Sequence, residues 1–92
     1  MTTAQTPIYL ELDSDNASRA LEETRGKIES GDELTLDFSR ITRVEPGVVR
    51  SLEALAQAAA EKTAKVTLRG VNVGVYKVLK LARLAAQFSF ER

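Results

Sequence analysis

The turn that precedes the longest amphipathic run of the chain is the first place to look for chemistry. Glu45, Pro46 and Gly47 follow the strand-like run LTLDF and come just before a helical pattern. Turns from a strand into a helix often hold a bound phosphate or a nucleophilic side chain. This turn has a proline at its apex, and Glu45 has no second titratable group at a matched spacing. We therefore expect Glu45 to be a surface charge that complements the helix dipole rather than a catalytic acid.

The composition removes several further kinds of chemistry. The 92 residues include no cysteine and no histidine, which excludes disulfides, thiol nucleophiles, imidazole catalysis and zinc sites with nitrogen or sulfur ligands. The carboxylates lack the spacing of an EF-hand, and Gly70 and Gly74 lack that of a nucleotide-binding loop. An enzyme built from the remaining residue types would need a pocket with convergent polar groups. We predict no catalytic residue, no metal and no cofactor.

The balance of charge bears on the partner. Lysine and arginine together number 13, as do aspartate and glutamate, so the net charge is zero. Proteins that bind nucleic acids normally carry a basic excess, so we expect no nucleic-acid partner. No apolar run approaches the roughly 18 residues of a membrane span, and the N-terminus lacks the pattern of a secretory signal. The sequence predicts a cytoplasmic protein without direct membrane insertion.

Hydrophobic periodicity predicts one domain, residues 1–92, in which strands and helices alternate. Strand patterns occupy Ile8–Leu12, Glu33–Ser39 and Lys65–Gly70, and Phe88–Phe90 predicts a last short strand or a docking tail. Helical patterns occupy 17–30, 46–63 and 73–85. Strands joined through helices of this length run parallel with right-handed crossovers, which indicates an α/β core. We expect both phenylalanines against the sheet, and exposure would instead mark an apolar docking patch.

The stretch from Leu34 to Leu84 resembles the STAS domain family, the domain of bacterial anti-sigma factor antagonists. The matching features are the strand LTLDFS, the lead-in with Ile41 and Val44, an acidic residue with a small-residue turn, and the run VTLRGVN before a short helix. The part VTLRGVNVGVYKVLKLARL looks most like the STAS subunit of bacterial lipid-asymmetry ABC transporters. The resemblance implies an α/β fold with a mixed sheet of about four strands and helices packed against it. It also implies that the N-terminal hairpin of the family is shortened here.

The resemblance gives the turn an implied role. In the family, an aspartate precedes a serine or threonine, and phosphorylation of that hydroxyl breaks the complex with a partner kinase. Glu45 takes the aspartate position and Pro46 takes the hydroxyl position, where no oxygen is available for phosphorylation. Ser39, Thr42 and Ser51 lie nearby but out of register with the motif. We predict a binding module that is constitutive or regulated elsewhere, with its turn held in one conformation by Pro46.

Two kinds of protein partner fit this resemblance. The first is an anti-sigma factor of the kinase type, and the alternative is the ATPase of a lipid-transport ABC complex, with this domain as an accessory subunit. A homodimer is compatible with both. The predicted surface joins the turn, the outer face of the following helix and a basic edge of the third helix, whose tyrosine is typical of interfaces. It comprises Thr42, Glu45, Pro46, Gly47, Val48, Arg50, Ser51, Glu53, Ala54, Gln57, Tyr76, Lys77 and Lys80.

Some of these residues also have a simpler explanation. Proline is common at the first position of any helix. On the same helix, Ser51, Ala54 and Ala58 form a stripe of small residues that would let a partner backbone approach closely. Alanine is also the best helix former, so the stripe fits an ordinary helix equally well.

Overall fold

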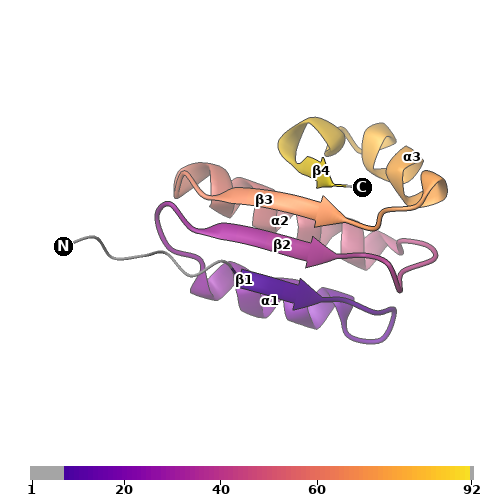
Figure 1. The fold of residues 1–92 in the computed structure, drawn as a ribbon, viewed down its shortest axis with the longest axis horizontal. Coiled ribbons are helices and arrows are strands. Elements are labelled where there is room, and N and C mark those ends of the chain that lie inside the picture. Colours follow the sequence, from indigo (N-terminus) through magenta and orange to yellow (C-terminus); the bar gives the residue numbers. More distant parts are fainter. Residues whose placement is uncertain (1–7, 92) are drawn as a thin grey trace.

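Helices cover one face of a four-stranded sheet in the computed structural model (Figure 1), which describes residues 8–91. In chain order the elements are β1 (Ile8–Glu11), α1 (Ala17–Lys27), β2 (Glu33–Asp37), α2 (Pro46–Glu61), β3 (Lys65–Arg69), α3 (Val73–Leu81), the 3₁₀ turn η1 (Ala85–Gln87) and β4 (Ser89–Glu91). The predicted α/β fold with about four strands is confirmed.

The strands lie in the order β1-β2-β3-β4, and every neighbouring pair is parallel. Over residues 8–91 the sheet is therefore parallel throughout rather than mixed, because every connection between these strands contains a helix. The shortened N-terminal hairpin falls on residues before Ile8, which lie outside the described part of the chain. The predicted strand near Phe88–Phe90 is confirmed as β4.

The register of the strands separates an apolar face from a polar face. Leu36 on β2 pairs with Leu68 on β3, and both side chains are completely buried beneath the helices. The alternate positions, such as Thr35 and Tyr9, form rows on the opposite face, where the Tyr9 hydroxyl donates a hydrogen bond to Asp37 at 2.6 Å. Tyr9 on this face is 50% exposed, so the face is open to solvent within the described residues, whereas a sheet that is parallel throughout is usually covered on both faces.

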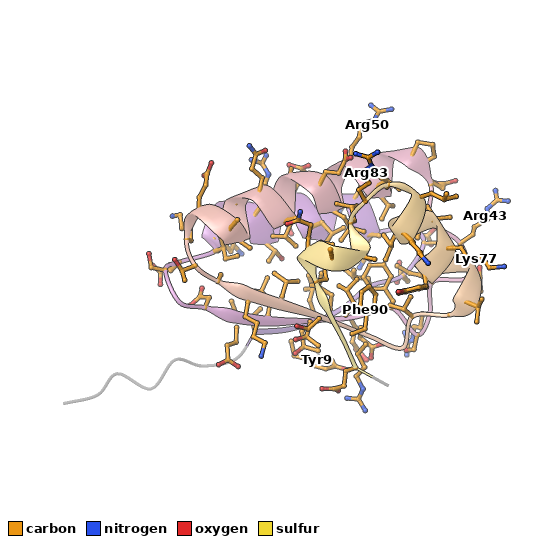
Figure 2. The ribbon with its side chains drawn as sticks, turned by 90° about the horizontal axis from the view of Figure 1, so that it is seen from above. Tyr9, Arg43, Arg50, Lys77, Arg83 and Phe90 are labelled. Atoms are coloured by element: carbon orange, nitrogen blue, oxygen red, sulfur yellow. The ribbon has the colours of Figure 1, made fainter. Side chains whose placement is uncertain are left out.

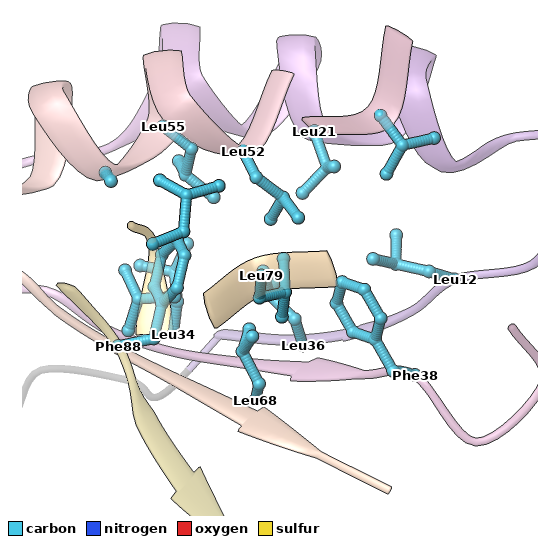
Figure 3. Close-up of a cluster of buried hydrophobic side chains, with 14 of the residues drawn as sticks. Leu12, Leu21, Leu34, Leu36, Phe38, Leu52, Leu55, Leu68, Leu79 and Phe88 are labelled. Carbon is cyan, nitrogen blue, oxygen red and sulfur yellow. The ribbon is translucent and has the colours of Figure 1, made fainter. Parts of the chain in front are cut away.

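Leucines from all three helices meet the sheet in one core (Figure 3). Leu21 comes from α1, Leu52 and Leu55 come from α2, and Leu79 comes from α3. Each is fully buried, and burying a leucine side chain contributes about 2 kcal/mol. Because α3 places Leu79 in this shared core, its position relative to the rest of the domain is fixed.

Two helices end earlier than the apolar pattern predicted. After Lys27 the chain becomes extended at Ile28, whose side chain turns into the core, and Gly31, with φ 79°, serves the next turn. After Leu81, Arg83 adopts φ 63° and the chain turns Leu84 into the core. Ile28 and Leu84 lie beyond the ends of α1 and α3 but are buried by the turns that follow these helices. The apolar pattern in the sequence therefore extends past the end of each helix.

Candidate functional site

The turn between β2 and α2 is exposed, and both of its ends are anchored in the core. Thr42, Glu45 and Pro46 face solvent, whereas Ile41 on one side and Val48 on the other are buried. Helix α2 begins at Pro46, with Glu45 as the preceding cap residue in an extended conformation. The predicted position of the proline at the first turn of the helix is confirmed. The turn therefore presents its apex outward from a fixed base.

The side chain of Asn72 joins this turn to the start of α3. Its Oδ1 accepts a hydrogen bond from the backbone N–H of Val75 at 2.8 Å. Its Nδ2 donates to the carbonyl oxygens of Ile41 at 3.3 Å and Thr42 at 3.2 Å. The helix cap follows the usual preference for asparagine at this position, whereas the bonds to the turn join distant parts of the chain. One side chain therefore caps a helix and positions the turn.

The loop between β3 and α3 packs against the base of the turn. The backbone N–H of Phe38 donates to the carbonyl of Arg69 at 2.7 Å. One residue later Gly70 has φ 72°, and a Cβ atom there would lie 2.9 Å from the Cβ atom of Ser39. Both the backbone angle and the close contact require glycine. Gly70 is therefore a turn residue that packs closely against the neighbouring loop.

Asp37, at the end of β2, shapes the same base. Its carboxylate accepts hydrogen bonds from the backbone N–H of Ser39 at 2.9 Å and from the hydroxyl of Tyr9. The Ser39 hydroxyl, the Tyr9 hydroxyl and the Ser39 backbone lower the pKa of Asp37 from 3.8 to about 2. The same contact raises the pKa of Tyr9. Asp37 is therefore ionised at neutral pH and acts as a fixed acceptor rather than as an acid.

The structure distributes the predicted partner residues unevenly. Val48 and Ser51 are buried and Ala54 is half-buried, so these three are poorly placed to meet another protein. The rest are exposed: Thr42, Glu45, Pro46, Gly47, Arg50, Glu53, Gln57, Tyr76, Lys77 and Lys80. Arg43, within the predicted turn, is exposed as well.

The small-residue stripe on α2 faces α1, which explains the burial of Ser51. The carboxyl pKa of Glu22 on α1 is lowered first by its bond to Arg25 and also by the Ser51 hydroxyl. At the start of α2, a Cβ atom on Gly47 would lie 3.6 Å from the Oγ atom of Ser18. The close approach predicted for a partner backbone is therefore made by α1 of the same chain.

The predicted residues on α3 lie at the same end of the molecule as the turn. Figure 2 shows Lys77 of α3 and Arg43 of the turn at that end. The ring of Tyr76 packs edge-on against Phe90 of β4, with centroids 5.2 Å apart. Phe88 is buried as predicted, but Phe90 remains 36% exposed. The structure thus brings the turn and α3 together through Asn72 and adds Phe90 to the α3 surface.

The arrangement offers exposed charged groups beside a hollow. A hollow of about 320 Å³ lies beside the turn, and its charged lining residues are Asp15, Arg43 and Glu45. Within residues 8–91, no group of three possible metal ligands occurs, and every buried side-chain polar atom has a hydrogen-bond partner. No helix in this range has the length and apolar character needed to cross a membrane.

Comparisons with known proteins identify the fold and the family. A family model described as "Mlab, STAS domain" matches residues 10–88. A crystal structure from Thermotoga maritima, provisionally assigned as an anti-sigma factor antagonist, is similar with a TM-score of 0.67 and 17% sequence identity, over 88% of this chain and 71% of that chain. At this identity the likeness concerns the fold alone. A search of curated proteins finds no match to this sequence. Because the family model spans most of the sequence, the chain belongs to the STAS domain family.

Proposed function

We propose that this STAS domain is a non-catalytic protein-binding module of the anti-sigma factor antagonist type, without a phosphorylation switch at its turn. The observation that carries the proposal is the position of Pro46, which is exposed at the first residue of α2, where the family motif has a hydroxyl. Its main contact area, which we name the turn surface, comprises Thr42, Arg43, Glu45, Pro46, Gly47, Arg50, Glu53 and Gln57.

The absence of a hydroxyl at position 46 makes binding through the turn surface constitutive. A phosphate adds about −1.5 to −2 charges, and in the family this added charge breaks the complex. Among the nearby hydroxyls, that of Ser51 is buried and that of Ser39 is hydrogen-bonded to Asp37. Thr42 is exposed and remains the one of the three from which a kinase could regulate the turn.

The first partner class is an anti-sigma factor of the kinase type in the cytoplasm of a bacterium. The fold likeness to the Thermotoga maritima protein supports this class. In this role the domain would take part in transcription regulation by holding the anti-sigma factor. The turn surface suits such contacts, because Arg43, Arg50 and Glu53 offer exposed charges of both signs around a rigid apex.

A second partner class is the ATPase of a lipid-transport ABC complex. The description of the matching family model favours it, because the sequence resembles the STAS subunit of bacterial lipid-asymmetry transporters. The same turn surface would then contact the ATPase and stabilise the assembly without touching lipid.

Affinity capture followed by reconstitution tests the proposal. The wild-type domain is compared with Arg50→Glu on α2 and with a matched control, Lys65→Glu, which makes the same charge change on the open face of the sheet. We expect an anti-sigma kinase or an ABC ATPase to bind the wild type and the control at least ten-fold more tightly than Arg50→Glu, measured with the purified partner. If purified members of both classes bind all three proteins equally or not at all, the proposal is wrong.

Phosphorylation is tested separately with the purified kinase-type partner. We expect incubation with ATP to leave the turn unlabelled and the affinity unchanged, as judged by mass spectrometry and titration calorimetry. Phosphate on Thr42 together with loss of binding would show that the switch has moved rather than disappeared.

A further inference from the structure

Most of the exposed large apolar side chains gather on α3 and β4. Val73 is 71% exposed and Leu81 is 85% exposed, and Tyr76 and Phe90 are exposed beside them. Val73, Tyr76 and Phe90 line a hollow of about 660 Å³ together with Val71. This volume is about twice that of the hollow beside the turn. Exposed apolar walls around a depression are typical of a site that receives a side chain from a partner.

Basic side chains follow the lining residues Val73 and Tyr76 along α3 and form an outer rim, whereas the charged residue in the lining itself is Glu91, whose carboxylate lies 3.6 Å from Arg69. Lys77, Lys80 and Arg83 are exposed, and Tyr76 separates the hollow from a second one that Lys80 and Arg83 line. The ion pairs found within residues 8–91 are Arg25–Glu22 and Arg69–Glu91. None of the three cations on the rim is therefore neutralised by an acidic side chain in the described part of the chain.

The acidic and basic side chains are unevenly distributed along the sequence, with the basic excess in the part that contains α3 and β4. Residues 1–39 contain three basic and nine acidic side chains, a net charge of −6, whereas residues 40–92 contain ten basic and four acidic side chains, a net charge of +6. The strand order places β1 and β4 at opposite edges of the sheet. The zero net charge thus conceals an acidic first part of the chain. The segment 73–90, beside the β4 edge, holds Lys77, Lys80 and Arg83 and no acidic side chain, a local excess that attracts anionic partners.

We propose that α3 and β4 form a docking surface for an acidic protein segment that inserts an aromatic or aliphatic side chain into the hollow. The Tyr76–Phe90 pair and Val73 receive this anchor, and Lys77 and Lys80 hold the acidic residues on either side of it. The inference rests on the proposed function in one respect, since Tyr76, Lys77 and Lys80 belong to the predicted partner surface. The inference adds to the proposed function that these residues select a partner segment with acidic residues around one apolar side chain.

The shape of the surface favours a protein segment over a membrane. Helix α3 has nine residues and is about 13 Å long. Helices that bind at a membrane interface present a continuous apolar face. Here Lys77 and Lys80 lie between the exposed Val73 and Leu81, and the aromatic rings form the walls of a hollow. A protruding side chain fills such a hollow, whereas a bilayer surface does not.

Fluorescence anisotropy with three labelled synthetic peptides tests the inference. The probe is the acidic peptide Glu-Asp-Glu-Phe-Leu-Glu-Asp-Glu. One control replaces Phe and Leu with Ser, and the other replaces all the acidic residues with Lys. We expect the probe to bind at least ten-fold more tightly than either control. If the Ser peptide binds as tightly as the probe, binding is non-specific charge attraction without an apolar anchor, and the inference is wrong. Absence of probe binding up to about 1 mM would also overturn it.

Variants locate the binding on the protein. Lys77→Glu and Val73→Asp should each weaken binding of the probe at least ten-fold, whereas Lys65→Glu should not. Val73 is mostly exposed at the first position of α3, so aspartate there complements the helix dipole and should preserve folding, as checked by thermal melting. If the probe binds both variants as well as the wild type, the α3–β4 surface is not its site.

Two further measurements distinguish other occupants. Sedimentation of phosphatidylglycerol vesicles with the wild type but not with Lys77→Glu would assign the surface to a membrane. A dimer in analytical ultracentrifugation that Lys77→Glu abolishes would assign it to a second copy of this chain. Either result overturns the inference. The peptide assay uses no partner protein and the capture assay uses no peptide, so failure of this inference and failure of the proposed function give different results.

Discussion

Replacing Asn72 separates the two functions of its side chain. Because the Val75 N–H requires an acceptor, the amide oxygen faces α3 and the nitrogen must face the carbonyls of Ile41 and Thr42. The Asn72→Asp variant keeps the acceptor for the helix cap but removes the donor to the turn. The Asn72→Ala variant removes both. Comparison of Asn72→Asp with the wild type measures the hydrogen bonds to the turn, and comparison of the two variants with each other measures the helix cap.

The expected magnitudes follow from the hydrogen bonds that each variant loses. Loss of the helix cap costs about 1 kcal/mol. The two bonds to the turn are long, at 3.2 and 3.3 Å, and Asn72 is exposed, so we assign each about 0.5 kcal/mol. Asn72→Ala should therefore lower the free energy of unfolding by about 2 kcal/mol, and Asn72→Asp by about 1 kcal/mol. For a domain of this size, 1 kcal/mol corresponds to about 4–8 °C in Tm.

Urea denaturation and amide hydrogen exchange measure the two effects without any partner. We expect both variants to speed exchange at the turn amides of Thr42 and Arg43, and only Asn72→Ala to speed exchange at Val75. If Asn72→Asp matches the wild type in stability and in exchange at the turn, Asn72 is only a helix cap and the turn is held by other contacts. If the two variants lose equal stability, the cap contributes nothing.

Three further predictions concern the base of the turn and α2. Gly70→Ala should lower the free energy of unfolding by about 2 kcal/mol or more in urea denaturation, because it combines φ 72° with a 2.9 Å contact to Ser39. The depressed pKa of Asp37 contributes stability above pH about 4 that is lost as the pH falls toward 2. Asp37→Asn should flatten this acid dependence in melts, and an unchanged slope would contradict the assigned hydrogen bonds. Ser51→Glu should destabilise the domain by about 2 kcal/mol or more, because it buries a charge between α1 and α2.

The elements of the fold were predictable because each carries its own pattern. Alternating leucines marked the strands, and a clear apolar stripe from Val48 to Ala59 marked α2. The helix ends were less predictable. The pattern of α3 continued through Leu84, but the backbone at Arg83 adopts a left-handed angle that closes the helix and buries Leu84 by a turn. Left-handed angles are usually predicted from glycine, so the angle at Arg83 could not be predicted from its residue type.

The candidate site was predictable in its location but only partly in its contacts. The exposed turn before Pro46 was found from the resemblance and from proline chemistry. The bonds from Asn72 to the turn join residues 30 and 31 positions apart, which no local pattern reports. The burial of Ser51 was missed for a related reason, since a small polar residue beside the outer face of α2 fits either a partner or a neighbouring helix.

These contacts change the explanation for the rigidity of the turn. Proline acts largely through the unfolded state, because it restricts φ whether or not the chain is folded. The bonds from Asn72 and the close packing of Gly70 act in the folded state, where they hold the turn against the next loop. Pro46→Ser should therefore lower stability by less than about 1 kcal/mol and leave the turn in place. The shape of the turn depends on Asn72 and Gly70, and Pro46 determines whether that turn can carry a phosphate.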